Sequence, residues 1–266
     1  MADLGIYVRL ARAQVRGQLS YRGSFVMNCL GQALAQANDL LVILIVFGRV
    51  AALGGFDITA VLLFYALSGM SFGLADMVVG SIERLPTYVR TGTFDVVLIR
   101  PLATLFQLFA GDFQLRRIGR VLTAFGTLVY VLSTSDIHWT PARAVLLVLT
   151  PLAGATIFGA IFVAANSVSF WFVDARELAN TVTYGGSYLT SYPITVYMGW
   201  MRTLLAYIVP GAFVAYYPGL TLLDRADPLG APTWLGWLDT PVALLAALAA
   251  GLIWRSAVRH YRGTGS

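Results

Sequence analysis

Long uninterrupted apolar runs are the feature that most constrains how this chain can fold. Several of them approach or exceed the ~20 residues that a helix needs to cross ~30 Å of hydrocarbon. Hydrophobic residues make up 58% of the chain and charged residues 12%, whereas soluble proteins average about 45–50% apolar and about 25% charged. The runs are continuous and not built of alternating ~10-residue segments, which excludes a membrane β-barrel. The sequence therefore predicts an all-α integral membrane protein.

The apolar runs predict six transmembrane helices in a single membrane domain covering residues 1–266. Before the first span, arginines follow one face of residues 1–22 and apolar residues follow another, which predicts an N-terminal amphipathic interfacial helix. The basic face carries Arg9, Arg12 and Arg16, and the apolar face Leu4, Val8, Ala11, Val15 and Leu19. The spans are expected at about 24–47, 58–80, 118–134, 144–172, 201–217 and 240–257. The fifth is interrupted by Pro210 and Gly211, and the Tyr-rich, semi-polar residues 178–200 lead into it.

The distribution of arginine predicts the orientation of these spans. With six spans and a cytoplasmic N-terminus, 15 of the 18 arginines fall on the cytoplasmic side and 3 on the outer side. Cytoplasmic loops carry an excess of positive charge, so both termini are expected in the cytoplasm. The outer arginines are Arg49, Arg143 and Arg225, and the cytoplasmic ones include Arg202, Arg255, Arg259 and Arg262.

Residues 81–102, SIERLPTYVRTGTFDVVLIRPL, form a charged and amphipathic segment between the second and third spans. A segment of this kind is expected to lie along a surface and to present a charged face. Ser81 is expected to cap a helix that Gly92 ends, while Pro86 indicates a late start or a kink. Two interpretations stay open from composition alone: a docking helix for a partner protein, or a solvated surface helix. The charged residues are Glu83, Arg84, Arg90, Asp95 and Arg100.

Four polar residues form a stripe along one face of the first predicted span: Asn28, Gln32, Gln36 and Asp39. Polar groups at this depth must face protein or water and not lipid. They are predicted either to line a substrate pathway or to form hydrogen bonds between helices, typically worth about 0.6–2 kcal/mol each. Asp39 is the strongest functional candidate, because an ionisable group inside a span is costly.

Two other patterns concern the contacts of the spans. Gly69 and Gly73 have GxxxG spacing, which permits close helix approach and is interpreted as packing within the bundle. Arg116, Arg117 and Arg120 cluster at the start of the third span and are expected to snorkel to the membrane interface.

Several chemistries lack the residues they need. The chain contains no lysine, so it cannot supply the lysine of a GxxxxGK[ST] phosphate-binding loop. One cysteine, Cys29, and two histidines, His138 and His260, make no recognisable metal-ligand spacing. Neither a metal site nor nucleic-acid binding is predicted.

Three stretches resemble permease subunits of ABC-2-type (type V exporter-like) ABC transporters, in the bacterial branch of uncharacterised ABC-2 permeases. They are SYRGSF (20–25), RTGTFDVVLIRPL (90–102) and SYPITVYMGWMRTLLAYIVPGAFVAYYP (191–218). The resemblance implies a multi-pass exporter subunit of the bacterial inner membrane, paired with an identical or related permease and with two ATPase subunits. It makes residues 81–102 a cytoplasmic coupling helix that includes Gly92 and Phe94. It also implies that ATP and Mg²⁺ bind to the partner ATPase, with no cofactor on this chain and membrane lipid around it.

Two other functions compete with this interpretation. An ion-driven secondary transporter is expected to carry repeats and charged residues near the bilayer midplane, where only Asp39 qualifies. A membrane-embedded lipid-modifying enzyme would need clustered acids, histidines or a nucleophile, and the two histidines are expected at opposite membrane faces. The transported substrate stays open among lipids, drugs, peptides and polysaccharides.

Overall fold

A computed structural model describes residues 2–111, 113–172 and 175–261, and all regular elements within these ranges are helices. Leu53 and Phe56 add one isolated β-bridge that closes a turn between two helices. This confirms the predicted all-helical class. Arg262 lies outside the described residues, and the described part does not extend to the side chains of Leu4, Val8 and Ala11.

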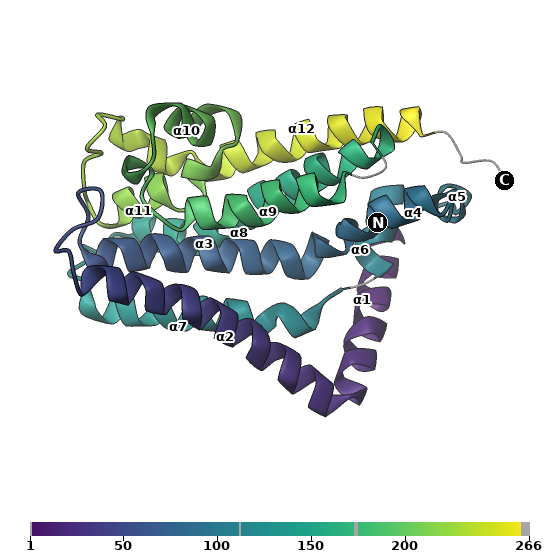
Figure 1. Ribbon diagram of the computed structural model, residues 1–266, viewed down its shortest axis with the longest axis horizontal. Helices are drawn as coiled ribbons and strands as arrows, with labels where there is room; N and C mark the ends of the chain where they lie inside the picture. The colour runs from purple at the N-terminus through teal and green to yellow at the C-terminus, as the bar shows by residue number, and fades with distance from the viewer. Residues whose placement is uncertain (1, 112, 173–174, 262–266) are drawn as a thin grey trace.

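The long helices lie side by side along the long axis of the molecule (Figure 1). They are α2 (Arg22–Phe47), α3 (Ile58–Val79), α7 (Ile118–Thr134), α8 (Pro141–Ser167), α9 (Arg176–Thr190) and α12 (Asp239–His260). The remaining helices gather at the two ends of this bundle. We call one end the α4–α6 end; it holds α1 (Ala2–Ser20), η1 (Gly80–Arg84), α4 (Leu85–Arg90), α5 (Phe94–Leu98), α6 (Thr104–Gly111), η2 (Leu115–Arg117) and η3 (Val168–Phe170). The other, the α10–α11 end, holds η4 (Ile194–Val196), α10 (Gly199–Thr203), the π-helix η5 (Leu204–Ile208), η6 (Gly211–Phe213), α11 (Tyr216–Leu222) and η7 (Thr233–Trp237).

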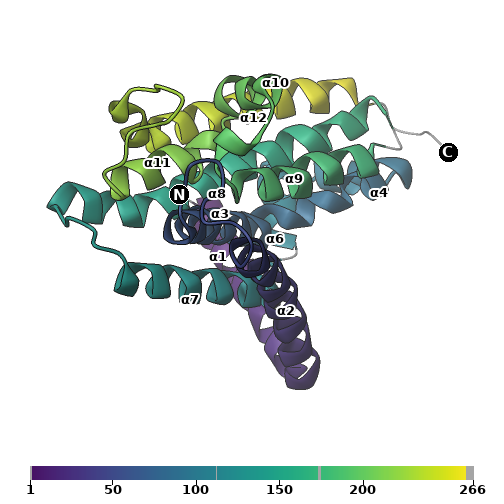
Figure 2. The same ribbon diagram turned by 60° about the vertical axis from the view of Figure 1, so that its left-hand side comes forward.

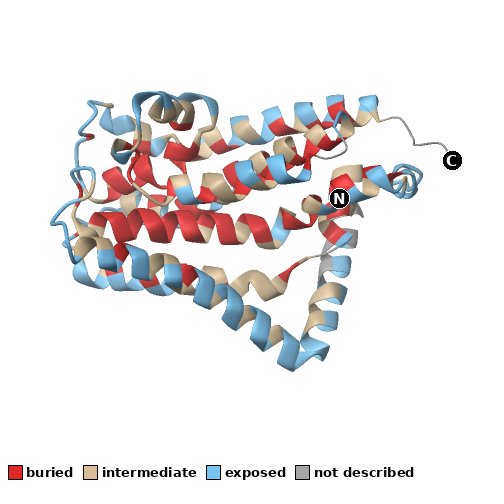
Figure 3. Cartoon of the chain, in the orientation of Figure 1, coloured by how far each residue is buried: buried red, intermediate tan, exposed pale blue. Residues whose placement is uncertain are grey.

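Helix α3 is the centre of the bundle and is buried along almost its whole length (Figure 3). It contacts α7, α8 and α9, and small residues allow these helices to come close. A Cβ atom on Gly73 would lie 2.7 Å from the Cγ2 atom of Val121 in α7, and one on Gly69 would lie 3.1 Å from Cβ of Ala124. The GxxxG pair therefore packs inside the bundle, as the sequence analysis expected.

Four of the helical segments in the described part of the chain are long and apolar enough to cross a membrane. They are Arg22–Phe47, Ile58–Arg90, Pro141–Phe170 and Asp239–His260. Four of the six predicted spans correspond to them. Helix α7 coincides with the predicted third span at 118–134, and with 17 residues it is shorter than these four segments.

The fifth predicted span is not one straight helix. Gly199–Ile208 and Gly211–Leu222 are bent by 72° relative to each other, which makes them either a broken span or a re-entrant loop. The break falls at Pro210 and Gly211, where the sequence predicted an interruption. The preceding residues form α9, which the sequence analysis did not predict and which packs along α3 and α8.

One arginine lies at the opposite end from the one predicted. The guanidinium of Arg202 donates to the backbone oxygens of Thr195 and Tyr197, at 2.8 and 2.6 Å. Thr195 donates in turn to the backbone oxygen of Gly54, in the turn between α2 and α3. Arg202 therefore belongs to the α10–α11 end, because α9 carries the chain across the bundle before this residue.

Helix α1 crosses the α4–α6 end at a steep angle to the bundle, and with the first part of α2 it extends away from the other helices (Figures 1 and 2). Two glutamines attach it. Gln14 donates to the backbone oxygen of Gly111 at 2.9 Å, and Gln18 donates to that of Phe113 at 2.5 Å. The predicted helix at 1–22 is thus present and separate from α2, with Arg9, Arg12 and Arg16 exposed.

The contact of Gly73 with Val121 predicts an effect of substitution on stability. We expect Gly73→Ala to lower the free energy of unfolding by about 1–3 kcal/mol, because the added methyl group overpacks the α3–α7 contact. Gly126→Ala in α7 is the matched control, since a Cβ there meets nothing within 4 Å. Thermal unfolding of both variants in lipid nanodiscs measures the difference. Equal midpoints would contradict this account of the α3–α7 contact.

Candidate functional site

The segment between α3 and α7 continues the central helix before it turns away. Helix α3 passes through η1 into α4 as one run of 33 residues, from Ile58 to Arg90. Pro86 lies in the first turn of α4, where a missing N–H is tolerated. Gly92 follows the helix with φ of +70°, a left-handed conformation that suits glycine and ends the helix as predicted.

The predicted cap at Ser81 is wrong. Ser81 is buried, and its hydroxyl donates to the backbone oxygen of Leu108 in α6 at 2.9 Å. Because η1 continues directly from α3, no free helix N-terminus exists there for a side chain to cap. Ser81 instead ties the start of the segment to α6.

Phe94 anchors α5 to the ends of two long helices. It is fully buried, and its ring centroid lies 5.1 Å from that of Phe170 in η3, 6.5 Å from that of Trp254 and 5.0 Å from that of Tyr261. Trp254 lies in α12, and η3 follows α8. The base of α5 therefore joins the ends of α8 and α12.

Beyond this anchor, α5 and the residues after it expose both apolar and charged side chains; we call Arg90–Arg100 the α5 tip. Ile99 is 81% exposed and Val96 is 47% exposed. Arg90, Asp95 and Arg100 are exposed as well. Desolvation raises the pKa of Tyr261, and the nearby Asp95 carboxylate raises it further. A mixed apolar and charged protrusion of this kind is suited to contact another protein.

Glu83 and Arg84 are the two remaining charged residues of the predicted 81–102 segment, and they lie beside the bundle. Glu83 is half-buried and pairs with Arg117 of η2 at 3.6 Å, while Arg84 is exposed. Arg117 also pairs with Asp76 at the end of α3, and the hydroxyl of Tyr184 from α9 lies beside the pair. Burial lowers the pKa of Arg117, and Tyr184 opposes that shift. This charge cluster links η1, α3, η2 and α9 at the α4–α6 end.

The fold buries one half of the polar stripe of α2 fully or partly and leaves the other half exposed. Gln36 is buried, and its Oε1 accepts a hydrogen bond from Nε of Arg120 at 2.7 Å. The backbone oxygen of Gln36 accepts a second one from the hydroxyl of Tyr65, at 2.5 Å. Asp39 is half-buried and attracts the same guanidinium. Asn28 and Gln32 are exposed.

Around this contact lies a small polar cavity between α2, α3, α7 and α9, which we call the intrabundle pocket. Its volume is about 10 Å³, room for about one water molecule. The guanidinium of Arg120 stacks over the ring of Phe72, 4.4 Å from its centroid. The remaining lining is mostly hydroxyls, from Tyr65, Ser68, Ser187, Tyr188, Ser191 and Tyr192.

Sequence reasoning missed most of this pocket. Arg120 was expected to snorkel outward, yet it points into the bundle, because Gln36, Asp39 and the face of Phe72 stabilise it there. The tyrosines and serines of α9 were treated as a connecting segment. The signal was the hydroxyl-rich run from Tyr184 to Tyr192, whose polar side chains recur at helical spacing.

The comparisons with known proteins give a family. A family model described as ABC-2 family transporter protein matches residues 33–265. No curated protein and no solved structure matches the chain significantly. The matched range includes the intrabundle pocket, the α5 tip and the α10–α11 end.

The bond between Gln36 and Arg120 predicts a second stability effect. We expect Gln36→Leu to destabilise the protein by about 1–3 kcal/mol, because it leaves a buried guanidinium N–H without an acceptor. Gln32→Leu, one turn away on an exposed face, is the control and should leave stability unchanged or slightly raised. Chemical unfolding in nanodiscs compares the two. A loss for Gln32→Leu as large as that for Gln36→Leu would rule out the assigned role.

Proposed function

The chain belongs to the ABC-2 family of transporter proteins, and we propose that it is the permease subunit of an ABC exporter driven by a separate ATPase. The observation that carries this proposal is the α5 tip, which is exposed at its end and anchored at its base in the membrane bundle. ATP and Mg²⁺ bind to the partner, since this chain has no lysine for a phosphate-binding loop.

Six passes through the bacterial inner membrane follow from this proposal, by α2, α3, α7, α8, α9 and α12. Helix α9 makes the fifth pass, and the bent pair at 199–222 is re-entrant from the outer side. Contact with α3 and α8 buries Thr183, Ser187 and Thr190, so these polar side chains of α9 need not face lipid. With Arg202 assigned to the outer side, 14 arginines lie on the cytoplasmic side and 4 on the outer side, in place of 15 and 3. This excess of arginine still predicts that the α4–α6 end and both termini lie in the cytoplasm.

The α5 tip is the proposed docking site for the ATPase. Arg90, Asp95 and Arg100 supply charge, and Val96 and Ile99 supply apolar contact area. Phe94 does not touch the partner in this scheme, since it is fully buried. It transmits motion from the tip to α8 and α12 instead. Gly92 sets the turn between α4 and α5, while Glu83 and Arg84 flank the base of the segment.

The intrabundle pocket is the proposed contact for the polar part of the substrate. Gln36 and Asp39 reach it from α2, and Asn28 and Gln32 continue the polar stripe along the exposed side of that helix. The pocket is closed around about one water molecule, so it must widen when a substrate passes. Helix α2 is the element that can move, because few of its residues are buried against the other helices.

A second permease, identical or related, is proposed beside this one, with one ATPase for each. Several long helices expose apolar rows, including Leu34, Leu41 and Ile45 on α2 and Leu244, Leu248 and Leu252 on α12. In a membrane these rows contact either lipid or the second permease.

Ion-driven transport is the one competing function that a specific observation favours, because the ionisable Asp39 lies within the bundle in the field of the Arg120 guanidinium. Transport by the subunit without an ATPase, dependent on a proton or sodium gradient, would support it. Transport that requires an ATPase co-purifying with the chain would exclude it.

The docking proposal predicts the effect of changing the α5 tip. We expect Ile99→Asp to weaken association with the ATPase at least about tenfold, because interface hot spots contribute about 2 kcal/mol or more. Arg90→Ala and Asp95→Ala should lower transport-linked ATPase activity while membrane insertion stays normal. Leu229→Asp, an exposed apolar residue at the α10–α11 end, is the matched control. Co-purification and ATPase assays of the reconstituted complex measure these effects, and normal coupling in all three tip variants would refute the docking site.

The proposed fifth pass predicts a labelling pattern. In a Cys29→Ser background, Met198→Cys should react with a membrane-impermeant maleimide added to intact cells, because Met198 is 68% exposed and follows α9. Arg90→Cys should react only after lysis. If Met198→Cys also required lysis, α9 would not cross the membrane and the fifth pass would have to be reassigned.

A further inference from the structure

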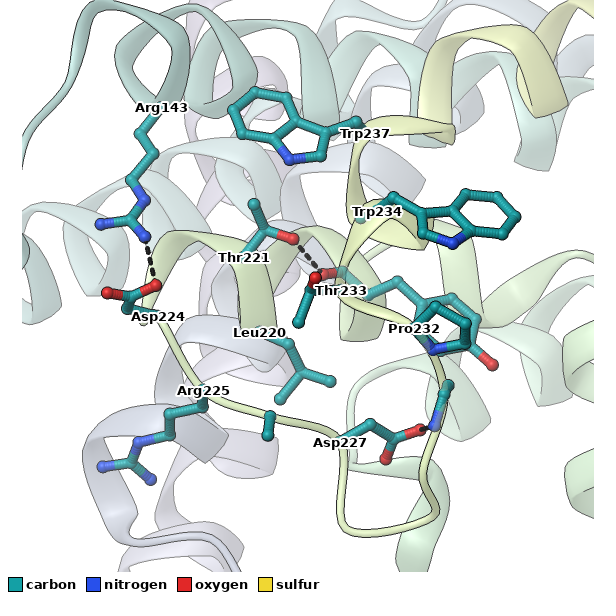
Figure 4. A pocket seen from close by; sticks show the side chains of 14 residues that line it. Arg143, Leu220, Thr221, Asp224, Arg225, Asp227, Pro232, Thr233, Trp234 and Trp237 are labelled. Atoms are coloured by element: carbon teal, nitrogen blue, oxygen red, sulfur yellow. Dashed lines mark hydrogen bonds and ion pairs between the residues drawn. The ribbon is translucent and has the colours of Figure 1, made fainter.

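A cavity of about 490 Å³ lies at the α10–α11 end, and its lining shares no residue with that of the intrabundle pocket (Figure 4). Its walls come from the start of α8, from α11, from the loop that follows α11 and from η7. In the view of Figure 4, Arg143 and Asp224 lie on one side, Trp234 on the other, and Trp237 between them. Its volume falls within the range of about 300–1,000 Å³ that is usual for small-molecule sites.

The walls of this cavity are held in place by the fold. Asp227 accepts hydrogen bonds from the hydroxyl of Tyr216 at 2.6 Å and from the backbone N–H groups of Leu229 and Ala231 at 3.0 and 3.2 Å. These bonds fix the loop after α11. Gly236 brings η7 against α11, since a Cβ on it would lie 2.6 Å from the backbone oxygen of Tyr217. The cavity is therefore formed before any ligand arrives, which reduces the ordering that binding requires.

The charges in the cavity are already paired. Arg143 donates to the carboxylate of Asp224 at 2.5 Å and to the backbone oxygen of His138 at 2.9 Å. Arg225 pairs with Asp57 at 2.5 Å. Because each cation has its own carboxylate, an anionic ligand would meet no uncompensated positive charge. A neutral ligand with both donors and acceptors suits these pairs better, since an Arg–Asp pair offers both at once.

Two indoles complete the lining. Trp234 is 58% exposed and Trp237 is 42% exposed, and in the described part of the chain neither indole N–H has a hydrogen-bond partner. An indole offers a flat apolar face and one donor at its edge. That combination matches a ring that carries C–H groups on its faces and hydroxyls at its rim.

We propose that this cavity binds a neutral sugar unit. The sugar ring stacks on an indole face, and its hydroxyls bridge the Arg143–Asp224 pair and the indole N–H groups. The site is distinct from the α5 tip and from the intrabundle pocket, and sugar binding there does not depend on the proposed transport function. With the proposed orientation the cavity opens on the outer side of the membrane, where it meets free sugars or the head groups of glycolipids.

The test uses the full chain in nanodiscs without maltoside detergent and saturation-transfer NMR. The probes are methyl α-glucoside, methyl α-mannoside, N-acetylglucosamine and maltose, with glucose 1-phosphate as the anionic comparison. We expect saturable transfer to at least one neutral sugar and at least tenfold weaker binding in Trp234→Leu and Asp224→Asn. Trp139→Leu is the matched control, because Trp139 is exposed at the same end and outside the cavity lining.

Three outcomes would overturn the proposal. The first is no transfer to any of the neutral sugars. The second is tighter binding of glucose 1-phosphate than of methyl α-glucoside, which would make the site an anion site. The third is an equal effect of Trp234→Leu and Trp139→Leu, which would leave the indoles as anchors at the membrane interface. Trp234 and Trp139 are each at least half exposed, so replacing either one by leucine should leave the fold intact. Thermal unfolding of the two variants checks this.

Discussion

Close packing of α3 against α7 and α8 is the constraint on which the rest of the structure depends. Gly69 and Gly73 let α7 approach so closely that Arg120 reaches across to Gln36 of α2, and Arg117 reaches Asp76 at the end of α3. A wider separation would leave both guanidinium groups in an apolar interior without partners, which is strongly unfavourable. The polar contacts of the bundle therefore follow from its smallest side chains.

The same packing explains why polarity is concentrated between α2 and α9. Helix α3 is buried along most of its length, while α2 contributes few buried residues and is held to the bundle largely through α7. An element fixed on one side can be displaced more easily than one enclosed by neighbours. The intrabundle pocket lies beside this loosely held helix, so outward movement of α2 would open the pocket without dismantling the core.

The sequence predicted those parts of the fold that local patterns determine. Apolar runs located α2, α3, α8 and α12, and the short run at 118–134 located α7, because hydropathy over ~20 residues is a local property. Helix α9 was missed since Thr183, Tyr184 and Ser187 lower its hydropathy, and only contact with α3 and α8 shelters them. The direction of Arg120, the bond of Ser81 and the burial of Phe94 all depend on residues distant in sequence. Of the candidate site, the sequence therefore indicated Gln36 and Asp39 but not the side chains that surround them.

The continuity of α3 with η1 and α4 bears on how a partner at the α5 tip can act on the bundle. The core helix and the residues that lead to the α5 tip are one run of 33 residues, so a push on the tip would act directly on the most buried helix. Phe94 provides a second route, through its ring contacts with Phe170 and Trp254 at the ends of α8 and α12. Helix α2 is joined to these routes mainly through α7, and to α3 by a few contacts that include the hydrogen bond from the Tyr65 hydroxyl to the backbone oxygen of Gln36. Motion of the tip would thus shift α3, α8 and α12 together relative to α2, and that relative shift is what opening the intrabundle pocket requires.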